Sequence, residues 1–211
     1  MIQCPSCGRR QEPRLTCEQC GAPLGADLDC FAALGLPRRL VIDAAALERA
    51  YHELSRKIHP DRFAQAPARV RDASLRSTAL LTRGYRTLRD PVARGLYWLE
   101  LRGEKLADNN KSVPPDLADL VFEVQDELAR MRDASGAEAA AIRERALARK
   151  AELEAAMGAL QDELARNFER WDAGGDAAAL LPDLKQTLSR IAYMRTLIRD
   201  VDREIGNLKA A

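Results

Sequence analysis

One short segment constrains the fold of this chain more than any other: an amphipathic helix that ends in His59-Pro60-Asp61. Between positions 47 and 58, apolar residues recur at i, i+4, i+7 and i+11, which is one stripe of an α-helix. Pro60 ends this helix because it lacks a backbone donor and clashes with the preceding turn. The residue before a proline favours extended geometry, so His59 leaves the helix as well. We therefore expect a basic helix followed by a loop that presents an imidazole and a carboxylate.

The length and composition of the chain favour small helical units over one large core. A chain of 211 residues has room for one or two domains. Its charged content of 31 %, its scattered alanines and its few β-branched clusters favour helices throughout. It has no apolar run of about 18 residues, so no membrane-spanning helix is expected. The first residues lack the basic and apolar parts of a secretory signal, so we expect a cytoplasmic protein.

The net charge of +1 is unevenly distributed along the chain. Residues 56–102 hold 11 basic and 4 acidic side chains, a net charge of +7, whereas residues 1–55 sum to −1 and residues 103–211 to −5. A positive field around the His-Pro-Asp segment would steer it toward an acidic protein surface. The same field would attract nucleic acid. A zinc-ribbon nucleic-acid-binding protein that uses the basic segment 56–102 is therefore the alternative to a protein-binding function.

Four cysteines near the N-terminus form two Cys-x-x-Cys-Gly motifs, with nine residues between the second and third cysteines. Four thiolates with this spacing can surround one metal ion tetrahedrally, and the glycine after each pair permits a tight turn. In a cytoplasmic chain the pattern indicates a metal site rather than disulfides. We expect one structural zinc ion. Iron is the competing metal because tetrahedral sulfur suits both, and a redox-active dithiol is a weaker alternative. The expected ligands are Cys4, Cys7, Cys17 and Cys20.

The surroundings of the cysteines indicate what this unit does. The residues between the two motifs are nearly neutral and include no aromatic side chain, unlike a nucleic-acid-binding ribbon. We expect the unit to contact a protein or to support the fold. A fifth cysteine, Cys30, lies in an apolar stretch and is expected to be a small buried hydrophobe.

Three more helical patterns follow a break rich in proline and asparagine at residues 103–115. Ser135-Gly136 separates the first pattern from the second, and Gly174-Gly175 separates the second from the third. Helices with apolar seams and short turns are expected to pack as an antiparallel bundle. The predicted seams are Leu117, Leu120, Val121, Val124, Leu128 and Met131; then Ile142, Ala146, Leu153, Met157, Leu160, Leu164, Phe168 and Trp171; then Leu181, Leu184, Leu188, Ile191, Met194, Ile198, Val201, Ile205 and Leu208.

Two aromatic residues fall beside these seams rather than within them. Phe122 follows the seam residue Val121, and Tyr193 precedes Met194, so each is turned about 100° from its seam. Glu123 and Asp126 lie close to Phe122 in the sequence. A large apolar side chain among carboxylates is a candidate anchor for a protein partner.

The His-Pro-Asp tripeptide resembles the signature of J-domains, the co-chaperone modules that stimulate ATP hydrolysis by DnaK-type chaperones. Residues 29–36 look like the first short helix and turn of a J-domain, and residues 70–88 look like its second long helix, closed by Arg89-Asp90-Pro91. These J-domain features, the junction at residues 88–99 and the C-terminal helices together are similar to HscB, the co-chaperone family of iron–sulfur cluster assembly. The resemblance covers residues 28–208. The extra four-cysteine unit resembles one found in some longer, chiefly eukaryotic, members.

The resemblance implies a mainly α fold in four parts. These are a small zinc ribbon or knuckle unit at residues 1–26, a helical J-domain at 27–102, a linker at 103–115 and an antiparallel three-helix bundle at 116–211. It implies that the motif His59, Pro60 and Asp61 couples to the ATPase of a DnaK/HscA-type chaperone. The basic positions that approach the acidic surface of that chaperone are then Arg56, Lys57 and Arg62.

The resemblance further implies that the bundle holds an iron–sulfur cluster scaffold protein. The matching positions are Phe122, Glu123, Asp126 and Tyr193. The chain departs from the family pattern at Ala118 and Asp119, where bulky apolar residues are usual, at Arg130, where an acid is frequent, and at Thr82, where an asparagine is common.

The implied function is that of a co-chaperone and not of an enzyme. The sequence has two histidines, no nucleophile elbow and no glycine-rich phosphate loop. Under the co-chaperone hypothesis we expect no nucleic-acid partner and no membrane partner. A J-protein with a different client is the second alternative, and the sequence leaves the oligomeric state open.

Overall fold

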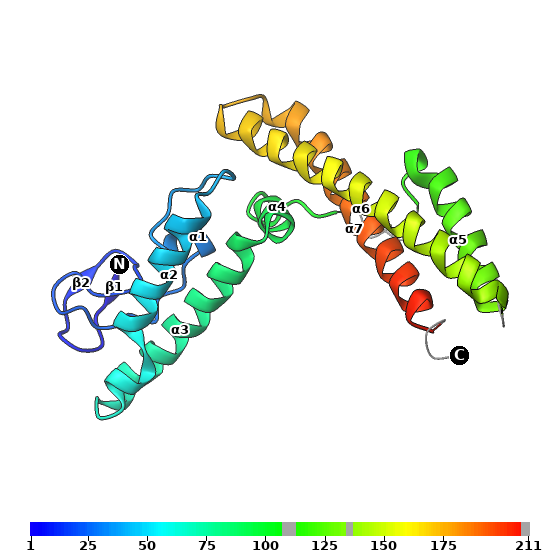
Figure 1. The fold of residues 1–211 in the computed structure, drawn as a ribbon. Coiled ribbons are helices and arrows are strands. Elements are labelled where there is room, and N and C mark those ends of the chain that lie inside the picture. Colours follow the sequence, from blue (N-terminus) through cyan, green and yellow to red (C-terminus); the bar gives the residue numbers. More distant parts are fainter. Residues whose placement is uncertain (107–112, 134–136, 208–211) are drawn as a thin grey trace. The chain divides into compact units, whose positions relative to one another are not determined.

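The computed structural model describes residues 1–106, 113–133 and 137–207, which fold into two compact units, Met1–Trp98 and Leu99–Ala211 (Figure 1). The regular secondary structure of the described residues is helical apart from one small ribbon of two antiparallel strands, so the predicted mainly α fold is confirmed. In chain order the elements are β1 (Ile2–Gln3), β2 (Arg10–Gln11), α1 (Cys30–Ala33), α2 (Ala44–Ile58), the 3-10 turn η1 (Pro60–Phe63), α3 (Ala68–Arg89), α4 (Pro91–Glu100), the 3-10 turn η2 (Pro115–Leu117), α5 (Ala118–Asp133), α6 (Ala137–Asp172) and α7 (Ala177–Asn207).

Two aspartates fix where α2 and α4 begin. The carboxylate of Asp43 accepts the N–H groups of the second and third residues of α2 at 2.9 and 3.2 Å. Asp90 lies between α3 and α4, with the extended geometry that a following proline imposes (φ −90°, ψ 117°). Its carboxylate accepts the N–H groups of Val92 and Ala93 at 2.8 and 3.1 Å. One Asp-Pro pair therefore ends α3 and begins α4.

The core of the first unit is built around Phe31 of α1, which is fully buried. Its ring lies 6.2 Å from the ring of Tyr97 and 6.0 Å from that of Trp98, both on α4. Cys30 is also fully buried, as predicted, and its backbone N–H donates to the hydroxyl of Tyr97 at 3.0 Å. Beside this core, Tyr51 of α2 stacks on Tyr85 of α3 at 4.2 Å, which joins the two long helices.

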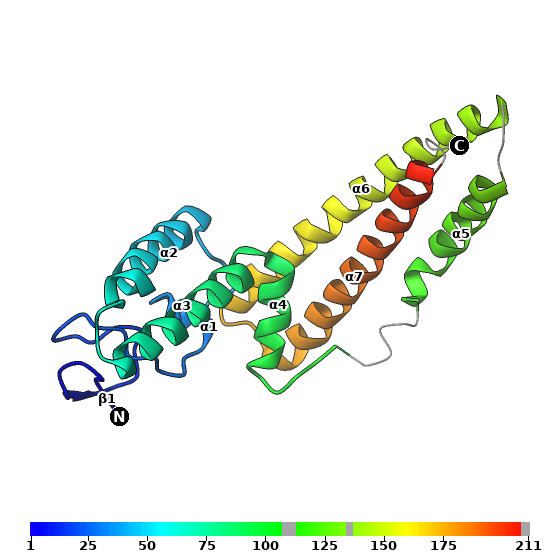
Figure 2. The ribbon, with the colours of Figure 1, turned by 90° about the horizontal axis from the view of Figure 1, so that it is seen from below.

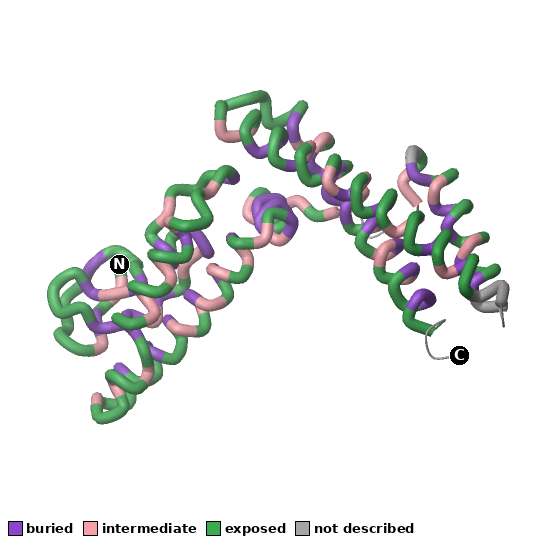
Figure 3. The backbone as a smooth tube through the Cα atoms, viewed as in Figure 1, coloured by how far each residue is buried: buried purple, intermediate pink, exposed green. Residues whose placement is uncertain are grey.

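The second unit is a helical bundle in which α6 and α7 lie side by side and α5 packs against both (Figure 2). Purple buried positions run along the facing sides of these helices, and their outer sides are exposed (Figure 3). The bundle also contacts the segment that follows α4: Glu104 pairs with Lys185 of α7 at 2.6 Å, and the guanidinium of Arg102 lies 4.7 Å from the ring centroid of Trp171. The first residues after α4 therefore pack on the hairpin of α6 and α7.

The predicted seam of α7 is wrong at two positions. Leu181 and Ile198 are only half-buried, whereas their neighbours Leu180 and Leu197 are buried. Each pair consists of two adjacent apolar residues about 100° apart, so the periodicity cannot decide which of them faces the core. The predicted turn at Ser135-Gly136 and the seam residue Leu208 lie outside the described residues. No helix within the described ranges is long and apolar enough to cross a membrane.

Candidate functional site

The His-Pro-Asp segment forms a compact turn at the end of α2. Its first residue has left the helix (φ −55°, ψ 132°), and Pro60 occupies the first position of η1, where its missing N–H costs nothing. The Nδ1 atom of His59 accepts the backbone N–H of Asp61 at 3.3 Å and lies 3.5 Å from its carboxylate. The side chains of His59 and Asp61 are 51 % and 89 % exposed, so both are available to a partner. The predicted loop is thus an ordered 3-10 turn.

Three basic residues surround this turn, and all three are exposed. Arg62 donates to the backbone carbonyl of Arg56 at 3.3 Å, which satisfies a carbonyl at the C-terminal end of α2. Lys57 pairs with Glu53 one turn earlier at 2.6 Å, and the hydrogen bond from Lys57 lowers the pKa of that carboxyl group. Solvent screens exposed pairs of this kind, so they contribute little to stability and a partner carboxylate can replace Glu53 at little cost.

The four predicted metal ligands meet at one point. Their sulfur atoms lie within 4.8 Å of one another. The Sγ atoms of Cys4 and Cys20 are 3.7 Å apart, and those of Cys7 and Cys17 are 3.8 Å apart. A tetrahedral site with metal–sulfur bonds of about 2.3 Å has sulfur–sulfur edges of roughly 3.8 Å. The four side chains therefore fit one tetrahedral metal ion, and this geometry suits zinc and iron alike.

The backbone of the two cysteine turns is built for thiolates. Gly8 and Gly21 follow the two Cys-x-x-Cys pairs with φ values of 77° and 71°, which only glycine adopts readily. Their N–H groups donate to the carbonyls of Cys4 and Cys17 at 3.0 and 2.9 Å, so each turn closes in the same way. In the first turn, the N–H groups of residues 6 and 7 also point at the sulfur of Cys4, at 3.4 and 3.5 Å.

The thiols of this cluster differ in acidity. Burial raises the pKa of Cys17, but hydrogen bonds from the backbone N–H groups of Cys20 and Gln19 outweigh it and lower that pKa to about 7. For Cys7, a backbone hydrogen bond from Arg9 lowers the pKa, whereas burial and the neighbouring thiols raise it, with a net value of about 11. Four thiolates held this close together would repel one another. A bound divalent cation removes this conflict.

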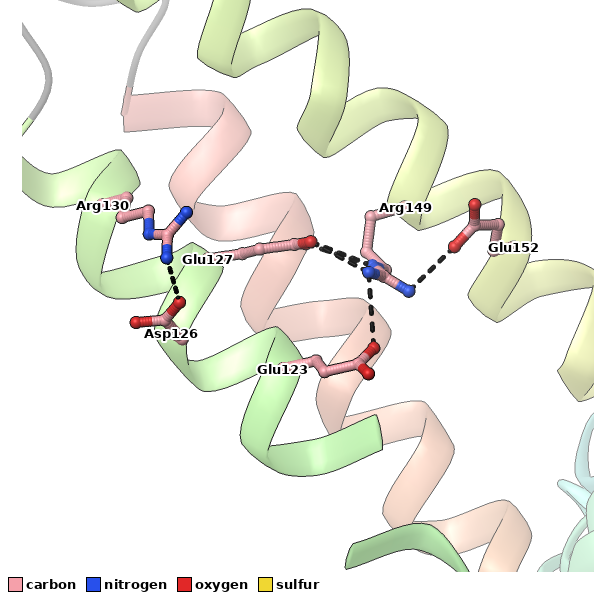
Figure 4. Close-up of polar contacts among 6 residues, drawn as sticks. All are labelled: Glu123, Asp126, Glu127, Arg130, Arg149 and Glu152. Carbon is pink, nitrogen blue, oxygen red and sulfur yellow. Dashed lines mark hydrogen bonds and ion pairs between the residues drawn. The ribbon is translucent and has the colours of Figure 1, made fainter. Parts of the chain in front are cut away.

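The predicted scaffold-binding residues lie on α5 and α7. Phe122 is 78 % exposed, and Tyr193 is half-buried. Glu123 points toward α6, where it lies 3.5 Å from Arg149, whereas Asp126 points the other way and pairs with Arg130 at 2.6 Å (Figure 4). The two carboxylates therefore lie on different sides of α5.

Ion pairs from α6 show how α5 and α7 are aligned. Arg149 contacts Glu127 of α5 at 2.9 Å, and the next residue, Lys150, contacts Asp202 of α7 at 2.6 Å. On α5, Phe122 lies five residues before Glu127. Tyr193 lies nine residues before Asp202, about 13 Å along α7. The two aromatic residues thus belong to adjacent helices at different heights.

Sequence reasoning missed Arg149 as an organising residue. Its side chain is only 22 % exposed. The guanidinium pairs with Glu127 of α5 and with Glu152 of its own helix, both at 2.9 Å (Figure 4). The hydrogen bond to Glu127 raises the pKa of the guanidinium, which burial alone would lower. The spacing of Arg149 and Glu152 was visible in the sequence, but the pairing with α5 was not.

Comparison with known proteins places the chain beside one group of co-chaperones. No model of a known protein family matches it. Over 75 residues it is 49 % identical to the "Co-chaperone protein HscB homolog" of Aromatoleum aromaticum. The aligned region covers 36 % of this chain and 42 % of the relative. Over 89 residues it is 42 % identical to the protein of the same name in an Azoarcus species, with coverage of 42 % and 50 %. The chain thus spans about half the length of the curated relatives it matches.

Solved structures extend the likeness to most of the chain. The human co-chaperone protein HscB aligns with 95 % of this chain and 97 % of its own, with a TM-score of 0.69 and 25 % identity. The chaperone HscB from Vibrio cholerae has the same fold, with a TM-score of 0.62 over 86 % of this chain and 99 % of its own, at 24 % identity. This chain is similar to HscB, in sequence over part of its length and in fold over most of it. The predicted resemblance to HscB is therefore confirmed, and the proteins that this HscB-like chain matches are named as co-chaperones and not as enzymes.

Proposed function

We propose that this HscB-like chain is a J-domain co-chaperone of iron–sulfur cluster assembly. In this proposal its J-domain, residues 27–102, stimulates the ATPase of a DnaK/HscA-type chaperone, and its bundle, residues 116–211, holds a cluster scaffold protein. The observation that carries the proposal is the exposed turn of His59 and Asp61 at the end of a basic helix, within an HscB-like fold. The cytoplasm stays the expected location.

The arrangement of charges supports docking on an acidic protein surface. Arg56, Lys57 and Arg62 are exposed around the turn, and the only acidic partner of Lys57 among the described contacts is the exposed Glu53. An incoming acidic surface would find cations on α2 and η1 with the imidazole and carboxylate between them. The protein moves no atoms of the nucleotide itself; its contribution is to bind the ATP-bound chaperone and favour the hydrolysing state.

Binding a client and a chaperone with the same molecule has a physical advantage. Each contact alone is weak, but a client already held by the bundle is present near the chaperone at a raised effective concentration. In this proposal the client is held by the face that includes Phe122 and Tyr193, and the four-cysteine unit binds one structural zinc ion. The sulfur–sulfur distances of 3.7 and 3.8 Å support a single tetrahedral ion, with iron as the competing metal.

The two histidines of the chain provide a matched test. His59→Gln should abolish stimulation of the ATPase of a DnaK/HscA-type chaperone while leaving the far-ultraviolet circular dichroism spectrum and scaffold binding unchanged. His52→Gln is the control, because His52 is exposed on the same helix, 3.7 Å from Glu48, and lies away from the turn. Unchanged stimulation by the His59 variant would refute the proposed mechanism.

Two alternatives are removed by separate measurements. A nucleic-acid-binding protein that uses residues 56–102 should bind DNA or RNA with an affinity that falls steeply as salt is added. No measurable affinity at low ionic strength excludes it. A J-protein with another client should stimulate the ATPase without binding an iron–sulfur scaffold, and a pull-down with the purified chain identifies both partners.

A further inference from the structure

The four-cysteine unit lies beside the predicted chaperone-binding residues. Its second cysteine turn, residues 16–22, lines one side of a surface hollow of about 400 Å³. The other side is formed by Lys57 at the end of α2 and by Arg62 and Phe63 of η1. Two of these three residues belong to the basic set that surrounds the His-Pro-Asp turn. The hollow is therefore continuous with the surface to which the proposed function assigns the chaperone.

A second hollow extends this surface along α2. Thr16 lines both hollows, so they adjoin at this residue. The second one is lined by Arg14 and Glu18 from the cysteine unit and by Glu53 and Leu54 from α2, among others. Glu53 lines one hollow and Lys57 lines the other, and these residues are one helical turn apart. The two hollows therefore form one groove along the axis of α2, with Thr16 at the point where they adjoin.

The cysteine unit is fixed in this position by its attachment to α3. The N–H of Gly25 donates to the buried hydroxyl of Ser77 at 3.1 Å. Gly25 has a φ of 60°, and a Cβ atom at this residue would lie 3.0 Å from the Cα of Ala73 and 2.9 Å from the guanidinium of Arg76. Such close approach requires glycine. We therefore treat the second cysteine turn as a wall of the groove that is held against the J-domain helices.

The chemistry of the groove indicates what it accepts. Lys57 and Arg62 place two cations along one wall, and Thr16, Gly21 and Ala22 give the other wall small side chains that leave room for an extended segment. A tetrathiolate site around a divalent cation carries a formal charge of roughly −2. Carboxylates in the groove must therefore face α2 and η1 and turn away from the cysteines.

We propose that the second cysteine turn and the basic residues Lys57 and Arg62 together form a groove that binds an acidic segment of the ATP-bound chaperone. This inference rests on the proposed co-chaperone function and extends it, because it gives the four-cysteine unit a direct part in partner binding. A chaperone without a segment that fits between the two walls would meet the cysteine turn as an obstacle. The unit would then select the partner as well as bind it.

Thr16 offers a test of the groove that folding defects cannot imitate. It is half-buried, and its backbone bridges to Pro23, so exchanging its side chain leaves that bridge intact. The affinity of the full-length chain for an ATP-bound HscA-type chaperone is measured at low salt for three variants. Thr16→Glu places a negative charge beside Lys57 and Arg62 and should weaken binding about three- to fivefold, the effect of one exposed ion pair. Thr16→Lys should strengthen it by a similar factor, and Thr16→Gln is the neutral control.

The outcomes separate this inference from the proposed function. Opposite effects of the two charged variants, both reduced by high salt, support the groove, because a damaged fold can only weaken binding. Equal affinities for all three variants, or equal weakening in all three, overturn it while the wild-type chain still stimulates the ATPase. If the wild-type chain neither binds nor stimulates the chaperone, the proposed function fails first. The metal content of each variant is measured alongside, so that a lost ion is recognised.

Discussion

The hydroxyl of Ser74 on α3 donates a hydrogen bond of 2.6 Å to the backbone carbonyl of Ile58, the last residue of α2. Both residues are fully buried. Carbonyls at the end of a helix have no partner within the helix, and here α3 supplies one. The bond therefore fixes the point at which α2 stops and the His-Pro-Asp turn begins.

Replacing this serine should loosen the turn. Ser74→Ala leaves the Ile58 carbonyl with only the hydroxyl of Thr78, at 3.5 Å, and we expect the free energy of unfolding to fall by about 1–3 kcal/mol. ATPase stimulation should also fall, because His59 is adjacent to the released carbonyl. Urea unfolding and chaperone ATPase assays measure the two effects. Thr78→Val removes the longer contact and should cost less; a Ser74 variant as stable as the wild type would contradict the assigned role.

The four-cysteine unit should depend on its metal ion. Its buried cluster consists of small or medium side chains, two of which are the expected ligands Cys4 and Cys17. So small a core does not hold a fold without a metal or another cross-link. We expect one metal ion per chain, and chelation should raise amide hydrogen exchange in residues 1–26 while the helices stay protected.

Cysteine variants supply the control for the metal prediction. Cys7→Ser removes a ligand and should lower the metal content measured by atomic absorption, which also identifies the metal. Cys30→Ala should keep the ion, because Cys30, the first residue of α1, is buried next to Tyr97 of α4 and is absent from the cluster of four sulfur atoms. A full complement of metal in the Cys7 variant would argue against the tetrahedral site.

The features that were predictable from the sequence depend on local chemistry. Pro60 and Pro91 mark helix boundaries because a proline acts on its immediate neighbours. The Cys-x-x-Cys-Gly spacing determines each turn within a few residues, so convergence of the sulfur atoms could be expected. The exposure of Phe122 follows from its angle relative to the seam residue Val121.

The features that were not predictable depend on contacts between distant segments. Ser74 and Ile58 are 16 residues apart, and Arg149 and Glu127 are 22 apart, so only the packing of the helices brings them together. The same holds for the placement of the second cysteine turn beside Lys57. In α7, adjacent apolar pairs such as Leu197 and Ile198 make the seam ambiguous, because the helix contacts both α5 and α6.

The client face can be tested without disturbing the fold. Phe122 is 78 % exposed, so Phe122→Ala should leave the free energy of unfolding nearly unchanged. Together with Tyr193→Ala it should weaken binding to an iron–sulfur scaffold protein about tenfold or more, as expected for aromatic anchors. Leu147→Ala is the control, since this leucine is 43 % exposed on α6, the bundle helix that carries neither Phe122 nor Tyr193. If the Leu147 variant weakens binding as much as the double variant, the proposed face is wrong.

Arg149 should hold α5 in place against α6. Its guanidinium donates to Glu127 at 2.9 and 3.1 Å and to Glu152 at 2.9 Å, with Glu123 at 3.5 Å (Figure 4). Arg149→Met keeps the length of the side chain but leaves three carboxylates that repel one another. We expect the free energy of unfolding to fall by about 1.5–3 kcal/mol, the range for hydrogen bonds to charged groups.

A matched arginine on α5 makes this prediction specific. Arg130 also pairs with a carboxylate, Asp126, at 2.6 Å, but both side chains are more than half exposed and both belong to α5. Arg130→Met should therefore cost no more than about 1 kcal/mol. Urea unfolding compares the two variants, and a double-mutant cycle of Arg149→Met with Glu127→Gln isolates the contact between α5 and α6. A coupling energy near zero would mean that apolar packing alone, around Val124 and Leu128, holds α5 in the bundle.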